Sequence, residues 1–141
     1  MSASQLILRT GDIRSFDDVR ATIVSVRPDW IFHLAGQASV AASWDDPGMT
    51  LAINAGGAIN LLEAVRAEVL TPRIVFIGSG EQYGIVPAQD NPIKETYPAA
   101  QVNPYVVAKQ TQDLLGYQYW GLISTPNCPS TRLQPFRPIP G

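Results

Sequence analysis

The sequence predicts an α/β fold in which short strands alternate with helices. Three apolar runs, at residues 6–8, 30–34 and 73–77, have the length and composition of strands. The segments between them place apolar residues at spacings of three and four, as amphipathic helices do. Strands that are joined through helices lie parallel, so we expect one parallel sheet that is covered by helices.

The first predicted helix follows a turn at residues 10–12. Ser15 stands where an N-cap is expected, and acidic residues follow it in the first turn. Apolar side chains recur at helical spacing from Phe16 to Val26 and predict one buried face. Pro28 ends this helix, and the second strand begins at Trp30.

The second predicted helix covers residues 47–68. Asp46 is placed to cap it, and Pro47 occupies the first helical position. Gly56 and Gly57 stand in its middle, where each costs roughly 1 kcal/mol of helix propensity relative to alanine. Two explanations remain open, namely close packing against a neighbouring element and a bend in the helix.

A candidate site follows the third strand. The strand runs into Gly78-Ser79-Gly80, and a helix at 104–119 carries Tyr105 and Lys109. Residues four apart share a helix face, and an ammonium group beside a phenol favours the phenolate of a general acid/base. Ser79 lies at the carboxyl end of a strand, where open α/β sheets bind ligands, and could polarise the same substrate oxygen. A Tyr-x-x-x-Lys pair by itself is ordinary. The strand and serine loop that precede this pair make it a candidate site.

The domain organisation is simple. We expect one folded unit over residues 1–122, with an irregular proline-containing loop at 85–103. Five of the twelve prolines fall after residue 125, so residues 123–141 are expected to form an irregular tail. We find no internal repeats.

Composition argues against several classes of partner. The net charge is −2 and no basic run is present, so the sequence offers no positively charged segment for binding nucleic acid or an anionic membrane. No apolar run approaches a membrane span and no signal peptide is recognisable, so a cytoplasmic location is expected. The single cysteine, Cys128, excludes an internal disulfide. The single histidine, His33, is expected to be a packed core residue, and we predict no metal site.

Five segments also carry a family resemblance. They read Gly-Asp-Ile-Arg at 11–14, His-Leu-Ala-Gly-Gln-Ala-Ser-Val at 33–40, Asn-Ala-Gly-Gly-Ala-Ile-Asn-Leu-Leu at 54–62, Gly-Ser-Gly-Glu-Gln-Tyr-Gly at 78–84, and Asn-Pro-Tyr through lysine at 103–109. In this order they resemble the extended short-chain dehydrogenase/reductase superfamily, in its NAD-dependent epimerase/dehydratase group acting on nucleotide sugars. The chain looks most like GDP-mannose 4,6-dehydratases and reductases of GDP-4-keto-6-deoxymannose, and Glu-Gln-Tyr-Gly favours the reductase branch.

The resemblance implies roles for four catalytic candidates. Tyr105 would be the acid/base, and Lys109 would assist it and hold the nicotinamide ribose. Ser79 would bind the 4-oxygen of the sugar. Glu81 stands where dehydratases keep the base that helps to eliminate water across C5 and C6, and a solvated loop carboxylate is an equally good interpretation of it.

The resemblance also implies NAD or NADP as the cofactor and a nucleotide sugar, GDP-linked, as the substrate. Asp12 and Ile13 would contact the adenine. The backbone of Leu34, Ala35 and Gly36 would line the ribose and phosphate. The cofactor-binding set is completed by Gln37, Asn54 and Ile77, together with Tyr105 and Lys109.

The start of the chain departs from the family pattern. The family opens with a strand, a Gly-x-x-Gly-x-x-Gly turn and a helix that binds the pyrophosphate, and these do not precede Met1. We therefore expect an incomplete Rossmann-like doubly wound parallel sheet that lacks the first two strands and the glycine-rich loop. In the order 3-2-1-4-5-6 the strand at 6–8 would be separated from the others, leaving residues 1–12 poorly anchored. Very poor cofactor affinity and no detectable turnover would follow.

Three functional hypotheses result. The first is a nucleotide-sugar oxidoreductase or dehydratase, in which hydride passes between nicotinamide and a sugar carbon while Tyr105 transfers the proton. The second is a non-catalytic remnant that forms a homodimer through the helices at 47–68 and 104–119. The third is a gene fragment without function. The sequence leaves open the sugar, the choice between NAD and NADP, and the choice between dehydratase and reductase.

Overall fold

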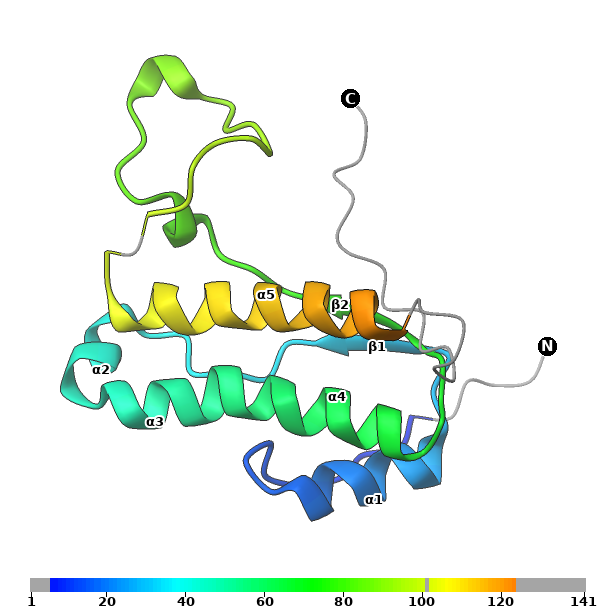
Figure 1. The fold of residues 1–141 in the computed structure, drawn as a ribbon. Helices are drawn as coiled ribbons and strands as arrows, with labels where there is room; N and C mark the ends of the chain where they lie inside the picture. The colour runs from blue at the N-terminus through cyan, green and yellow to red at the C-terminus, as the bar shows by residue number, and fades with distance from the viewer. Residues whose placement is uncertain (1–5, 101, 124–141) are drawn as a thin grey trace.

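The computed structural model describes residues 6–100 and 102–123 (Figure 1). Two parallel strands pack against a group of helices. The elements are α1 (Phe16–Val26), β1 (Trp30–His33), α2 (Val40–Asp45), α3 (Pro47–Leu51), a π-helical turn (Ala52–Gly56), α4 (Gly57–Ala67), β2 (Arg73–Phe76), two 3-10 turns (Gly80–Tyr83 and Ala88–Asp90) and α5 (Pro104–Ile123).

The first helix, α1, forms as its sequence predicts. The Ser15 side chain caps it by accepting a hydrogen bond from the backbone N–H of Asp18 at 3.2 Å. Arg27 ends it in the left-handed region, with φ of 45°, and donates its N–H to the carbonyl of Ile23. Ile23 is buried against α4, whereas Val26 at the end of the apolar face is half exposed.

The sheet consists of β1 and β2, paired in parallel with Trp30 opposite Arg73 and His33 opposite Phe76. The predicted parallel pairing is therefore confirmed, and each strand ends one residue earlier than predicted. Side chains of β1 alternate, because His33 is buried while Trp30 and Phe32 are more than half exposed. This strand is covered on one face only in the described part of the chain.

The predicted strand at residues 6–8 is absent. Leu6 and Leu8 are more than four-fifths exposed, and residues 6–10 have no regular structure. A strand is held by a ladder to a neighbour, and the described sheet contains only β1 and β2. The apolar run at 6–8 pairs with neither of these strands, and its side chains stay exposed. The chain becomes anchored at Asp12, whose backbone N–H donates to Asp18 Oδ2 at 2.9 Å.

The predicted helix at 47–68 is three helical segments in succession. It begins at Pro47 under an Asp46 cap, as predicted, with the N–H of Met49 donating to Asp46 Oδ1 at 2.8 Å. A π-helical turn over Ala52–Gly56 then joins α3 to α4, and Figure 1 shows the three segments as one continuous rod. A Cβ on Gly57 would lie 2.6 Å from Ile13 Cγ1, so close packing explains this glycine.

Replacing Gly57 with Ala is expected to lower the free energy of unfolding by about 1–3 kcal/mol, because Ile13 has to move. Gly56 provides a matched control. A Cβ there meets only the Leu51 carbonyl at 3.8 Å, so Gly56→Ala should be neutral or stabilise by about 1 kcal/mol. Urea unfolding followed by circular dichroism compares the two, and equal stabilities would rule out the packing explanation.

The core lies around α4, which runs between α1 and α5 (Figure 1). Leu61, Leu62 and Val65 of α4 pack with Ile23 of α1 and Ile74 of β2. Polar side chains join the same helices at the surface: Arg20 donates to Glu68 at 2.7 Å, and the Tyr119 hydroxyl of α5 donates to Glu63 of α4.

Two helices differ from the prediction. α2 was not predicted; Ser39 caps it by accepting from the N–H of Ala42 at 3.2 Å. α5 starts after an Asn103 cap and reaches Ile123, beyond the predicted end at residue 119. The predicted irregular tail lies outside the described residues apart from residue 123, which is helical, and Cys128 lies outside them.

Candidate functional site

Two neighbouring loops and one helix bring most of the candidate residues to one edge of the sheet. Residues 34–37 follow β1 and residues 77–79 follow β2, so both loops leave the carboxyl ends of parallel strands. α5 packs beside them and carries Tyr105 and Lys109, which are 7% and 8% exposed. Leu34 and Ile77, by contrast, are 73% and 44% exposed. A partly open apolar edge therefore lies next to a buried phenol and ammonium.

Lys109 is fixed by two hydrogen bonds. Its Nζ donates to the backbone carbonyl of Ile77 at 2.7 Å and to Gln112 Oε1 at 3.2 Å. Burial lowers the pKa of the Lys109 ammonium, and Asp113 on the same helix acts in the opposite direction. The bond to Ile77 attaches the middle of α5 to the end of β2, and this contact sets the position of the ammonium at the sheet edge.

The serine loop is held by Gln82 and Asp113, two side chains that were not predicted as site residues. Ser79 Oγ accepts from the N–H of Glu81 at 3.3 Å, and the N–H of Ser79 donates to Gln82 Oε1 at 2.9 Å. Gln82 Nε2 in turn donates to Asp113 Oδ2 on α5 at 2.7 Å. Gln82 therefore connects the loop to the helix that carries Lys109. The spacing of Ser79 and Gln82, a serine followed three residues later by glutamine, is a capping-box signal that could have indicated this.

Two loop positions show what surrounds the serine. A Cβ at Gly78 would lie 2.9 Å from Gln82 Oε1, so a larger residue there would require the end of the Gln82 side chain to shift. The Glu81 side chain is exposed. Its carboxylate is thus free to face a ligand or solvent, and both interpretations of Glu81 remain open.

The loop after β1 is held by Asn54, which is 1% exposed. Asn54 Oδ1 accepts from the N–H of Gln37 at 2.8 Å, and Asn54 Nδ2 donates to the carbonyl of Gln37 at 3.0 Å. A Cβ on Gly36 would lie 2.9 Å from the same Oδ1. The Asn54 amide therefore bonds both backbone groups of Gln37, as a neighbouring strand would, and this positions the candidate cofactor loop.

Replacing Asn54 with Ala is expected to lower the free energy of unfolding by about 1–3 kcal/mol, because it leaves both backbone groups of Gln37 without their partner. The amide proton of Gln37 should also exchange faster with solvent, as amide hydrogen exchange by NMR would show. Gln37→Ala is the control, since it keeps the backbone pair and removes only the bond from Nε2 to Ser39. Unchanged exchange in Asn54→Ala would contradict this role.

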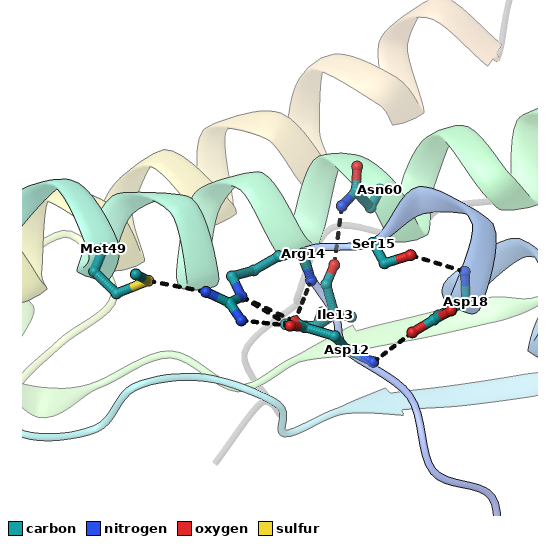
Figure 2. A network of polar contacts seen from close by, with 7 residues as sticks. All are labelled: Asp12, Ile13, Arg14, Ser15, Asp18, Met49 and Asn60. Atoms are coloured by element: carbon teal, nitrogen blue, oxygen red, sulfur yellow. Dashed lines mark hydrogen bonds and ion pairs between the residues drawn. The ribbon is translucent and has the colours of Figure 1, made fainter.

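Asp12 and Ile13 form a second group ahead of α1. Arg14 Nε donates to both carboxylate oxygens of Asp12 at 3.0 Å, and its Nη1 donates to Met49 Sδ (Figure 2). Hydrogen bonds from Arg14 lower the pKa of the Asp12 carboxyl to about 2. Asn60 Nδ2 of α4 donates to the carbonyl of Ile13 at 2.9 Å. These contacts tie the adenine candidates to α3 and α4 rather than to Tyr105 or Lys109.

His33 is 4% exposed, as expected of a core residue, and its ring meets Phe76 edge-on with 5.3 Å between the ring centroids. Burial, with a smaller contribution from the charge of Lys109, lowers the pKa of His33 to about 4. The side chain is therefore neutral at pH 7. The ring lies close enough to Lys109 for the ammonium charge to disfavour its protonation.

Among residues 6–100 and 102–123, no helix has both the length and the hydropathy of a membrane span. The same residues contain no group of three or more histidine, cysteine, aspartate and glutamate side chains arranged to hold a metal ion.

A family model described as GDP-mannose 4,6 dehydratase matches residues 1–133. The chain belongs to this family. A GDP-mannose 4,6-dehydratase of Vibrio cholerae is 33% identical over 123 residues, and the match covers 86% of this chain and 31% of that protein. A GDP-6-deoxy-D-mannose reductase of Pseudomonas aeruginosa is 40% identical over 95 residues, 67% of this chain and 31% of that protein.

A solved structure of RMD from Pseudomonas aeruginosa, complexed with NADPH, has the same fold. Its TM-score is 0.75 at 34% identity, over 84% of this chain and 40% of the other. The expected incomplete Rossmann-like sheet is therefore confirmed. As a member of the GDP-mannose 4,6-dehydratase family, the chain spans 31% of the length of the two relatives above.

Proposed function

We propose that the chain carries the nicotinamide-binding and acid/base part of an NAD(P)-dependent nucleotide-sugar enzyme of the dehydratase or reductase type. One observation supports this most strongly. The Lys109 ammonium is buried one helical turn after Tyr105 and is fixed to Ile77 at the carboxyl end of β2. Ligands of open α/β sheets bind at this end, and the serine loop continues directly from it.

The residues present fit a dinucleotide. An ammonium has three N–H groups, and two of those on Lys109 are used by protein acceptors among the described residues, so the third is free for a ribose hydroxyl. The exposed apolar side chains of Leu34 and Ile77 offer flat contact area to a ring. The Asp12 carboxylate, held by Arg14, offers an acceptor for the adenine amino group. Bound NAD(P) would supply or accept the hydride.

The chain's own groups would handle the proton. Tyr105 would exchange its hydroxyl proton with the 4-oxygen of the sugar, and the Lys109 ammonium stands one helical turn after it. Ser79 Oγ accepts from Glu81, which leaves its hydrogen to donate to the same oxygen. In a dehydratase, the exposed Glu81 carboxylate would take the proton whose loss accompanies elimination of water. A GDP-linked sugar is the proposed substrate, since the names of both relatives refer to a GDP-linked mannose or deoxymannose.

No detectable turnover is expected of a chain without the pyrophosphate loop, so assays with two substrates test both that expectation and the proposed function. The chain is incubated with GDP-4-keto-6-deoxymannose and NADPH, and separately with GDP-mannose and NAD or NADP, and products are identified by mass spectrometry. Reduction of the keto sugar would assign the reductase branch, and loss of water from GDP-mannose the dehydratase branch. Tyr105→Phe should suppress either reaction. Product that forms equally fast with Tyr105→Phe would overturn the proposed acid/base role.

A second candidate function is association of two copies through α3 and α5. An open apolar hollow of about 320 Å³ lies between these helices and α2, lined by Trp44, Leu51, Val102, Asn103, Pro104 and Val107. Further along α5, Leu114 and Tyr117 are about two-thirds exposed. Exposed apolar area of this kind often marks an interface. Sedimentation should then show dimers that Val107→Glu dissociates, whereas a monomer at high concentration would exclude this function.

A further inference from the structure

Gln112 is a buried polar residue that the proposed chemistry has not used. It is 1% exposed and stands on α5 one turn after Lys109. Its Oε1 accepts from Lys109 Nζ at 3.2 Å. Lysine can only donate, so this contact also fixes which end of the Gln112 amide faces the ammonium.

Packing by itself does not explain a glutamine at this position. The Nε2 of Gln112 has no hydrogen-bond partner within the described part of the chain. Burying an amide group that leaves a donor unmade is unfavourable, and an apolar side chain of the same volume would avoid that loss. The contact with Lys109 is what the amide provides and an apolar residue would not.

We propose that Gln112 is a positioning residue that holds the Lys109 ammonium in place for the cofactor. Together with the Ile77 carbonyl it occupies two of the three N–H groups and orients the third. The assignment of that third N–H to a ribose hydroxyl depends on the proposed function. The contact between Gln112 and Lys109 does not, and it can be tested without cofactor.

Other charged or titratable groups also surround Lys109. Asp113 lies on α5 and raises the lysine pKa, and His33 on β1 interacts with its charge. Tyr105 lies one turn earlier on α5. The test must therefore separate the effect of Gln112 from these neighbours, and it does so by changing only residue 112.

The sequence contains two lysines, Lys109 and Lys94, which makes the test direct. In protein labelled with 13C-lysine, the Cε signals are followed with pH, and Lys94→Arg assigns them. Gln112→Met keeps the volume but removes the acceptor, so Lys109 should lose its proton at lower pH. Gln112→Glu places a carboxylate there, so the Lys109 transition should move to higher pH. Lys94 should titrate unchanged in both variants.

The proposal would be overturned if Lys109 lost its proton at the same pH in the unchanged chain, in Gln112→Met and in Gln112→Glu. A residue that merely fills space would give this result. A second measurement needs no variant. With 15N-lysine and 13C-glutamine, a scalar coupling across the hydrogen bond should join Lys109 Nζ to the Gln112 side-chain carbonyl carbon, and its absence would also overturn it. If these results hold but NADPH binds equally well to Gln112→Met, positioning stands and the ribose contact of the proposed function fails.

Discussion

Lys109→Met is expected to weaken NADPH binding by about tenfold or more. The substitution keeps the length of the side chain but removes the ammonium that would donate to the ribose, and a hydrogen bond from a charged group contributes about 1.5–3 kcal/mol. The remaining acceptors, the Ile77 carbonyl and Gln112 Oε1, cannot replace a donor. Isothermal titration calorimetry measures the change in dissociation constant.

Lys94→Met is the matched control, because Lys94 is the other lysine of the sequence and lies in the exposed loop before α5. It removes the same charge and should leave affinity within about twofold. Equal weakening by the two substitutions would mean that net charge, rather than the position of Lys109, governs binding.

Acidification is expected to destabilise the chain through His33. The folded-state pKa of His33 is lowered from 6.5 to about 4, so between these values the unfolded chain binds the proton and the folded chain does not. Stability from this group is complete above pH 6.5 and falls as the pH is lowered towards 4. The full effect is about 3 kcal/mol. Urea unfolding at pH 7.5 and pH 4.5 measures most of it.

His33→Leu removes the titrating group while keeping an apolar side chain against Phe76. The variant should lose much less stability between the two pH values than the unchanged chain. Because His33 is the only histidine, its Hε1 proton resonance also gives its pKa directly by NMR. A midpoint near 6.5 would show that the ring is solvated and would remove the basis of this prediction.

Local signals predicted much of the fold. The caps at Ser15 and Asp46, the helical periodicity that follows them and the parallel pairing of two strands all hold in the structure. Residues 6–8 do not form the predicted strand, because a strand is held by pairing with a neighbour and these residues pair with neither β1 nor β2. α2 was missed because six residues are too few for helical periodicity to be recognised.

The candidate site was predicted less completely, because several of its hydrogen bonds join segments that are far apart in the sequence. Helical spacing was enough to place Tyr105 and Lys109 one turn apart on α5. The bond from Lys109 to the Ile77 carbonyl depends on how α5 packs on β2, which no local pattern contains. The same holds for Asn54, whose bonds to Gln37 cross between a loop and a helix seventeen residues apart.

We propose that a nicotinamide dinucleotide, NAD(H) or NADP(H), binds at the carboxyl edge of β1 and β2, beside Lys109. The most direct measurement is a titration of the unchanged chain, labelled with 15N and 13C-lysine, with NADPH by NMR. Saturable shifts are expected for the Lys109 signal and for the amides of residues 34–37 and 77–79, whereas the Lys94 signal should not move. No shifts at millimolar NADPH, or shifts centred on Lys94 and the loop at 85–100, would contradict it.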